Sequence, residues 1–167
     1  MKKIIDFYRR DIVFLQDSTG SQGPYINSAR DAVQSICARI SSSTSLSSGH
    51  IRFGLIAFRD HPPQDNTFVT QNFGFTSSIS QVKQHLDSLT AIGGGDGPEA
   101  STAALAEALM MDWREEASKV AVLITDAPPH GIGEVRDGFP NGSPDRSSLY
   151  IYQNEGNLPV TFQKTIL

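Results

Sequence analysis

Residues 12–17 of this chain read Ile-Val-Phe-Leu-Gln-Asp, a short apolar run that ends in a carboxylate. A continuous apolar run is typical of a strand that is buried on both faces, as in a parallel sheet. The pattern recurs at Ile51–Phe58 and at Val120–Ile124, and the latter run is followed by Thr125 and Asp126. These runs predict the centre of an open α/β sheet.

Apolar residues at helical spacing lie between the predicted strands. They predict helices over residues 26–40 and 79–89, and a third helix that opens at Pro98 and Glu99. Weak alternation over residues 68–75 predicts a short edge strand. Strands that alternate with helices imply a Rossmann-like, mostly parallel sheet with helices on both faces. Sheets of this type place their sites at the carboxyl ends of the strands.

Composition limits the classes of protein that fit this sequence. The chain has 167 residues and a formal net charge of −4, which predicts one domain and argues against nucleic-acid binding. No apolar run approaches the ~18 residues that a membrane span needs. The single cysteine, Cys37, permits no internal disulfide and favours a reducing compartment. We therefore expect a cytoplasmic protein with no membrane span.

Oxygen-bearing side chains follow the predicted strands. Asp17, Thr19 and Ser21 come after the first strand, Asp96 lies in a glycine loop, and Asp126 follows the strand at Val120–Ile124. If the sheet is parallel, these loops meet at one edge. An all-oxygen set is what hard divalent cations prefer, so the sequence predicts a site for Mg²⁺ first, with Mn²⁺ or Ca²⁺ as alternatives.

The same loops carry a resemblance to a known family. Asp17-Ser18-Thr19-Gly20-Ser21 resembles the Asp-x-Ser/Thr-x-Ser signature of the von Willebrand factor A domain, and Gly93–Ala100 and Ile124–Asp126 resemble its second and third loops. The resemblance runs from about residue 11 to about residue 142. Phe58–Pro63 and Asp126–Gly131 resemble an intracellular subset of the family, some members of which are joined to an alpha-kinase domain. No kinase signature is present in this chain.

The resemblance implies a metal-ion-dependent adhesion site and a protein partner. By position it assigns the metal to Asp17, Thr19, Ser21, Asp96 and Asp126, and it implies that the partner binds through an acidic side chain at the ion. The surrounding partner surface is predicted to contain Arg59, Asp60, His61 and His130.

Two departures from the family pattern affect these expectations. Asp96 stands where many members have a threonine, so three aspartates would surround the ion and weaken its attraction for a partner's carboxylate. The chain beyond the third loop also lacks the expected helix, strand and helix. We therefore expect a domain over residues 1–146 and an atypical C-terminal segment over residues 147–167, with short strands at Leu149–Tyr152 and Val160–Phe162.

Other functions remain open at the level of sequence. A magnesium-dependent phosphatase of the haloacid dehalogenase kind also has an aspartate at a strand end, but it needs a second aspartate where this chain has Thr19, and a lysine near the site. A domain with a vestigial site is a further alternative, in which the aspartates only cap helices or form turns. With no base or nucleophile in place, we expect a binding protein and not an enzyme.

Overall fold

The computed structural model describes residues 9–43, 50–144 and 161–165. Its centre is a five-stranded sheet with the strand order β3-β2-β1-β4-β5. The strands are β1 (Arg10–Asp17), β2 (Ile51–Phe58), β3 (Thr70–Thr76), β4 (Ser118–Ile124) and β5 (Thr161–Thr165). β1 pairs in parallel with both β2 and β4, β4 pairs in parallel with β5, and β3 is an antiparallel edge strand. The predicted mostly parallel sheet is thereby confirmed.

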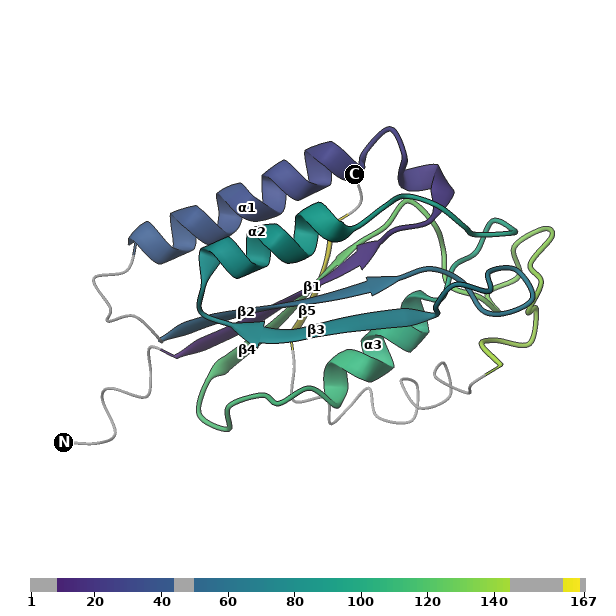
Figure 1. Cartoon of the computed structure of the whole chain (residues 1–167). Coiled ribbons are helices and arrows are strands. Elements are labelled where there is room, and N and C mark those ends of the chain that lie inside the picture. The colour runs from purple at the N-terminus through teal and green to yellow at the C-terminus, as the bar shows by residue number, and fades with distance from the viewer. Residues whose placement is uncertain (1–8, 44–49, 145–160, 166–167) are drawn as a thin grey trace.

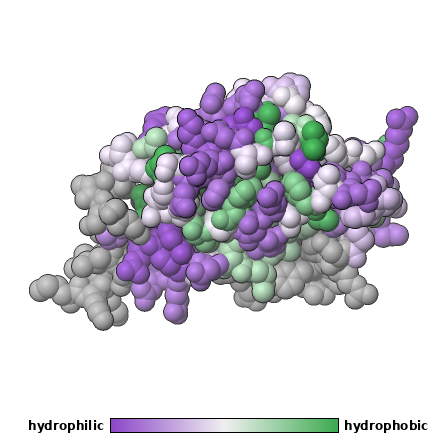
Figure 2. Space-filling view, viewed as in Figure 1, coloured by the Kyte–Doolittle hydropathy of each residue, from purple (hydrophilic) through white to green (hydrophobic). Residues whose placement is uncertain are grey.

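Helices cover both faces of the sheet, as predicted. Helices α1 (Ile26–Ser43) and α2 (Ile79–Ser88) lie on one face, and α3 (Ser101–Leu109) lies on the other (Figure 1). On the face seen in Figure 2, strongly hydrophobic residues form small separate groups among hydrophilic ones. No helix among the described residues is both long and apolar enough to cross a membrane.

The alternating side chains of β1 build two hydrophobic cores. Ile12 and Phe14 pack into the cluster beneath α1 and α2, whereas Val13 and Leu15 pack into the cluster beneath α3. All four side chains are buried. A strand that is buried on both faces needs apolar residues at every position, which explains the continuous run in the sequence.

A buried carboxylate, Asp11, lies at the N-terminal end of β1 and binds two arginine side chains there. Asp11 is 0% exposed and accepts hydrogen bonds from the guanidinium groups of Arg52 and Arg114, each at 2.7 Å at its closest. Burial favours the neutral acid, but the hydrogen bonds from Arg52 and Arg114 outweigh it and hold the pKa of Asp11 below its ordinary value.

Two predicted boundaries are corrected by the structure. Helix α1 continues to Ser43, where a loop was expected from residue 41, and α3 begins at Ser101, after Pro98 and Glu99. Glu99 lies outside the helix: its backbone N–H donates to the carbonyl of Pro128 at 3.0 Å, and it forms an isolated parallel β-bridge with Pro129. This contact joins segments that are distant in sequence, so local helix signals do not reveal it.

The C-terminal segment contributes one described strand. β5 begins at Thr161 and pairs with β4, so the strand expected over Val160–Phe162 is present with shifted bounds. The strand expected over Leu149–Tyr152 lies outside the described residues. The proposed boundary between residues 146 and 147 also lies there and stays a prediction.

Candidate metal centre

The loops at the carboxyl ends of β1 and β4 meet the glycine loop that precedes α3. The N–H of Gly20 donates to the carbonyl of Gly93 at 2.9 Å, which joins the β1 loop to the glycine loop. The hydrogen bond from Glu99 to Pro128 joins the glycine loop to the β4 loop. The expected meeting of the three loops at one edge is therefore found.

Four of the five predicted metal residues are connected by hydrogen bonds. Thr19 Oγ1 donates to Asp17 Oδ1 at 2.7 Å and lies 3.1 Å from Ser21 Oγ. Ser21 Oγ in turn donates to Asp126 Oδ1 at 3.1 Å. Asp17 and Thr19 are buried, whereas Ser21 and Asp126 are exposed. The group is thus anchored in the fold on one side and open to solvent on the other.

Asp17 is held in place from both sides. Its Oδ1 also accepts from the backbone N–H of Thr19 at 2.9 Å, and its Oδ2 accepts from Thr125 Oγ1 at 2.7 Å. Burial raises the pKa of Asp17; the hydrogen bonds from Thr19 and Thr125 oppose this, and the charge of Asp126 adds to it. A cation nearby would favour the ionised form of this carboxyl group.

A carboxyl group that the sequence did not single out as a ligand lies beside this set. Glu99 is 3% exposed, and its Oε2 is buried with no hydrogen-bond partner among the described residues. Burial, together with the negative charges of Asp17 and Asp60, raises the pKa of Glu99 to about 9. A hydrogen bond from Thr19 acts in the opposite direction.

Glycine at position 94 permits the close approach of Glu99 and Thr19. A Cβ atom at Gly94 would lie 2.9 Å from Glu99 Oε1 and 3.2 Å from Thr19 Cβ, and the backbone has a φ of +76°. Any other residue would push these two side chains apart. The orphaned oxygen of Glu99, set among hydroxyl and carboxylate oxygens, fits a hard divalent cation.

Asp96 occupies a different position. Its Oδ2 accepts from the backbone N–H of Gly138, and one of its oxygens lies in a group with Asp60 and His130. No hydrogen bond joins it to Asp17, Thr19 or Ser21 within the part of the chain that the structure describes. Its predicted role in the same metal set stays a prediction, and Glu99 is a further candidate for that set.

The four residues predicted to form the partner surface are buried, which corrects their role. Arg59 is 4% exposed, Asp60 0%, His61 3% and His130 2%. The guanidinium group of Arg59 donates to the carbonyls of Ser18 and Thr90 and to Thr67 Oγ1, and it stacks over the ring of Phe68 at 4.3 Å. Asp60 and His130 bind each other at 2.7 Å. These side chains hold loops together and do not face a partner.

Sequence analysis missed further residues of this edge. Gln22 Nε2 donates to Asp126 Oδ1 at 2.7 Å, and Asp137 Oδ1 lies 2.8 Å from His130 Nδ1. Glu99 had a signal, because it lies in the loop already assigned to the site. Asp137 had none, since the long loop that carries it has no periodicity or motif.

Comparison with known proteins shows which family this chain resembles. A family model described as the von Willebrand factor A domain matches residues 11–136. The alpha-protein kinase vwkA of Dictyostelium discoideum is 30% identical over 141 residues, which are 83% of this chain and 22% of that protein. A putative ariadne-like RING finger protein of Acanthamoeba polyphaga mimivirus is 28% identical over 77% of this chain and 12% of its own length. The chain thus spans less than a quarter of these relatives.

Solved structures show the same fold at lower identity. The pilus adhesin SpaC from Lactobacillus rhamnosus GG, in its open conformation, superposes with a TM-score of 0.58 at 19% identity over 75% of this chain and 16% of that one. Proximal thread matrix protein 1 from the mussel byssus superposes with a TM-score of 0.56 at 18% identity, over 98% of this chain and 37% of that one.

Proposed function

This chain belongs to the von Willebrand factor A domain family, a family of protein-interaction modules, and on that premise we propose that it is a non-catalytic, divalent-cation-dependent binding module. Members of the family commonly bind a divalent cation. The residues that would hold it here are Asp17, Thr19, Ser21, Glu99 and Asp126.

The buried, unpartnered Oε2 of Glu99 is the observation that carries this proposal. A carboxyl group in such a place is costly unless a proton or a cation accompanies it. The hydroxyl groups of Thr19 and Ser21 lie between Asp17 and Asp126 at hydrogen-bond distances, so the oxygens form one continuous set. A bound ion would supply an electrophilic position for an oxygen atom of the partner.

Local charge bears on the kind of partner. Two carboxylates balance a divalent cation, and a third gives the centre a net negative charge. Ionised Glu99 would therefore weaken the attraction for an acidic side chain of the partner, whereas neutral Glu99 would not. Binding through an acidic side chain stays a prediction, and its strength depends on the charge state of Glu99.

Exposed apolar side chains concentrate at this same edge. Six large hydrophobic residues are well exposed among the described residues. Two of them lie elsewhere: Ile36 on α1 and Met110 just after α3. The others lie on loops at the carboxyl edge of the sheet: Tyr25, Ile92, Ile132 and Val135. Aromatic and aliphatic side chains around a polar centre are what protein recognition uses.

The proposal is tested by thermal melting and partner capture. An ion at a hundredfold its dissociation constant stabilises the fold by about 2.7 kcal/mol, which corresponds to about 5–11 °C in a domain of this size. Mg²⁺ should produce such a shift in the wild type, and Ser21→Ala and Asp126→Asn should reduce it. Both substitutions change exposed side chains, so the fold should survive them.

Asp31→Asn serves as the matched control, because it removes an exposed carboxylate from α1. This variant should retain the full metal shift. A protein that is captured in Mg²⁺ and released by chelator should also be lost in Asp126→Asn and kept in Asp31→Asn. Equal metal shifts in all four proteins would contradict the proposal.

Two further expectations concern catalysis and cellular location. The phosphatase alternative gains no support, since the hydroxyl of Thr19 donates to Asp17 where that family needs a second acid. We place the protein in the cytoplasm on the basis of the buried, unpaired Cys37 and the similarity to a protein kinase.

A further inference from the structure

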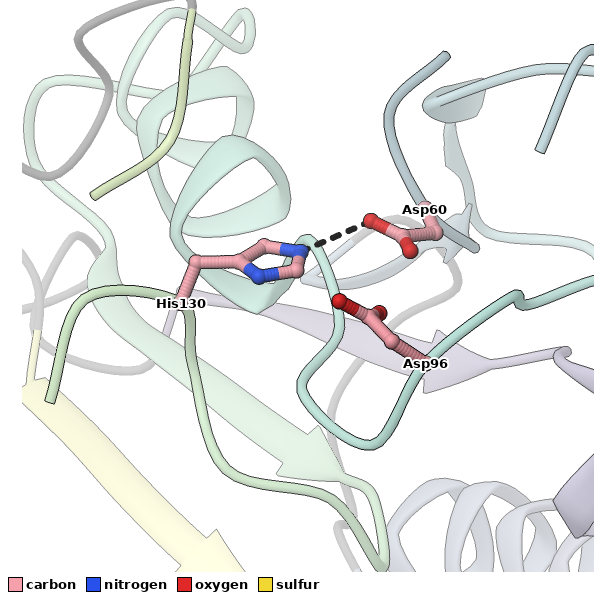
Figure 3. Close-up of side chains that lie close together, drawn as sticks. All are labelled: Asp60, Asp96 and His130. Carbon is pink, nitrogen blue, oxygen red and sulfur yellow. Dashed lines mark hydrogen bonds and ion pairs between the residues drawn. The ribbon is translucent and has the colours of Figure 1, made fainter. Parts of the chain in front are cut away.

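A second group of possible ligands lies at the same edge but involves other side chains. Asp60 comes shortly after β2, Asp96 lies in the glycine loop, and His130 lies in the loop after β4. Figure 3 shows the three side chains pointing toward one another from these three segments. One ligand atom from each lies within 4.8 Å of the others.

Two oxygens in this group have no hydrogen-bond donor. Asp60 is 0% exposed; its Oδ1 accepts from His130 Nε2 at 2.7 Å and from the N–H of His61, but its Oδ2 has no partner among the described residues. Asp96 Oδ1 is also buried and has no hydrogen-bond partner within the described part of the chain. Buried carboxylate oxygens are normally satisfied, so two that face each other require a proton or a cation between them.

The imidazole ring is oriented as in known metal sites. Asp137 Oδ1 lies 2.8 Å from His130 Nδ1, and backbone N–H groups of Gly131 and Phe139 each donate to Asp137 at 2.7 Å. A carboxylate behind Nδ1 fixes the ring and leaves Nε2 for an ion, which is how histidine ligands are usually supported. Nε2 is the ring atom that faces Asp60.

We infer that Asp60, Asp96 and His130 form a second divalent-metal site, which selects an ion of the zinc class. Two carboxylates and one imidazole are the donors that Zn²⁺ accepts in a four-coordinate site with one open position. The all-oxygen set around Asp17 favours Mg²⁺ instead. The second site does not depend on the proposed function, since it shares no ligand with the set around Asp17.

The distances suit an ion after small side-chain movements. Ligands at about 2.0–2.2 Å from an ion lie about 3 to 4.4 Å from each other, depending on their angle. Asp96 is partly exposed, so its carboxyl group can rotate and the ion can enter from this side. Without an ion, the ring of His130 joins the loops by its contacts with Asp60 and Asp137.

The test is zinc binding by the full chain after metals have been removed with chelator. Zn²⁺ is titrated by calorimetry in metal-free buffer at pH 7.5, and Co²⁺ provides a visible absorption band whose intensity reports four-coordinate geometry. The wild type should bind one equivalent of zinc. Asp96→Asn and His130→Gln should each weaken binding at least tenfold.

Two control variants separate this site from other zinc binding. Asp126→Asn alters the first centre and should keep the zinc site, and His85→Gln removes a histidine on α2 and should also keep it. Because Asp96 is partly exposed, Asp96→Asn should fold even if His130→Gln does not, and circular dichroism checks this.

The results decide between an ion and a proton. Loss of zinc and of the cobalt band in Asp96→Asn, with both kept in Asp126→Asn, supports the second site. Zinc affinity that is absent in the wild type, or unchanged in Asp96→Asn, overturns it and leaves a shared proton between Asp60 and Asp96. Loss in Asp126→Asn alone would assign zinc to the first centre and also overturn it.

Discussion

Replacement of Glu99 by glutamine should stabilise the metal-free protein at neutral pH. Glutamine has the shape of the protonated acid and carries no charge. In the fold, burial and the charges of Asp17 and Asp60 raise the pKa of Glu99 to about 9, against 4.5 as the ordinary value. Between these two values the folded state holds a proton that the unfolded state releases, so stability falls as pH rises.

The magnitude follows from the interval between the unfolded pKa and the working pH. At pH 7 this interval is roughly 2.5 pH units, and each unit is worth about 1.4 kcal/mol, which gives an upper estimate of roughly 3–4 kcal/mol. The upper pKa does not enter this figure, because pH 7 lies well below it. Glu99 is 3% exposed, so solvent screening does not reduce the effect.

Urea denaturation in chelator at pH 5, 6, 7 and 8 measures the effect. The stability of Glu99→Gln minus that of the wild type should increase by about 1.4 kcal/mol per pH unit over this range. Glu116→Gln, at an exposed position, is the control and should show no such slope. A difference that does not vary with pH would mean that Glu99 is ionised in the fold, and the reasoning would fail.

Added Mg²⁺ should stabilise the wild type more than it stabilises Glu99→Gln. Stabilisation by the ion requires an ionised carboxylate, so the wild type should gain more from Mg²⁺ than Glu99→Gln does. Equal gains in both proteins would remove Glu99 from the metal set.

Three further predictions concern other parts of the molecule. Asp11→Asn should cost about 2–4 kcal/mol, because it leaves two partly exposed guanidinium groups without their carboxylate. The pKa of Asp11 is lowered in the fold, so its contribution to stability is present above the ordinary value of 3.8 and is lost as pH falls through the folded pKa. Acid denaturation should therefore show a stability difference between wild type and variant that shrinks below this range. Gly94→Ala should cost about 1–3 kcal/mol through its positive φ and its contact with Glu99, whereas Gly97→Ala, where a Cβ meets nothing within 4 Å, should cost less in the same urea assay. Hydrolysis of an aryl phosphate in Mg²⁺ should stay at background, and turnover that disappears in Asp17→Asn would restore the phosphatase alternative.

The sequence was sufficient for those parts of the fold that depend on local pattern. Strands β1 and β2 are buried on both faces, and only a continuous apolar run meets that requirement, whereas the apolar run of β4 is only partly buried. The meeting of the loops then followed from the parallel sheet. The start of α3 was predicted wrongly because Pro98 and Glu99 carry an ordinary helix signal, while the pairing of Glu99 with Pro128 and Pro129 is long-range.

Local sequence patterns could not show which of the two acids in the glycine loop faces Thr19. Asp96 and Glu99 are both near the site, and the path of the loop decides which of them faces Thr19. That path depends on the positive φ angles of Gly93 and Gly94, at +79° and +76°. The burial of His130 could not be predicted either, because its partner Asp137 lies on a loop that contains no recognisable motif.

The charge of Asp60 acts on Glu99, yet the two centres can coexist because the net charge of the second group changes little when an ion enters. If His130 is protonated and Asp60 is ionised, the group of Asp60, Asp96 and His130 is neutral when Asp96 carries a proton and has one negative charge when Asp96 is ionised. A divalent ion that replaces the imidazole proton and binds both carboxylates also leaves the group neutral. The charge that Glu99 experiences from this group therefore changes by one unit at most, although a divalent ion has entered. Coupling between the centres then rests on the loop that carries both Asp96 and Glu99, since an ion that fixes one end of this loop limits the positions open to the other.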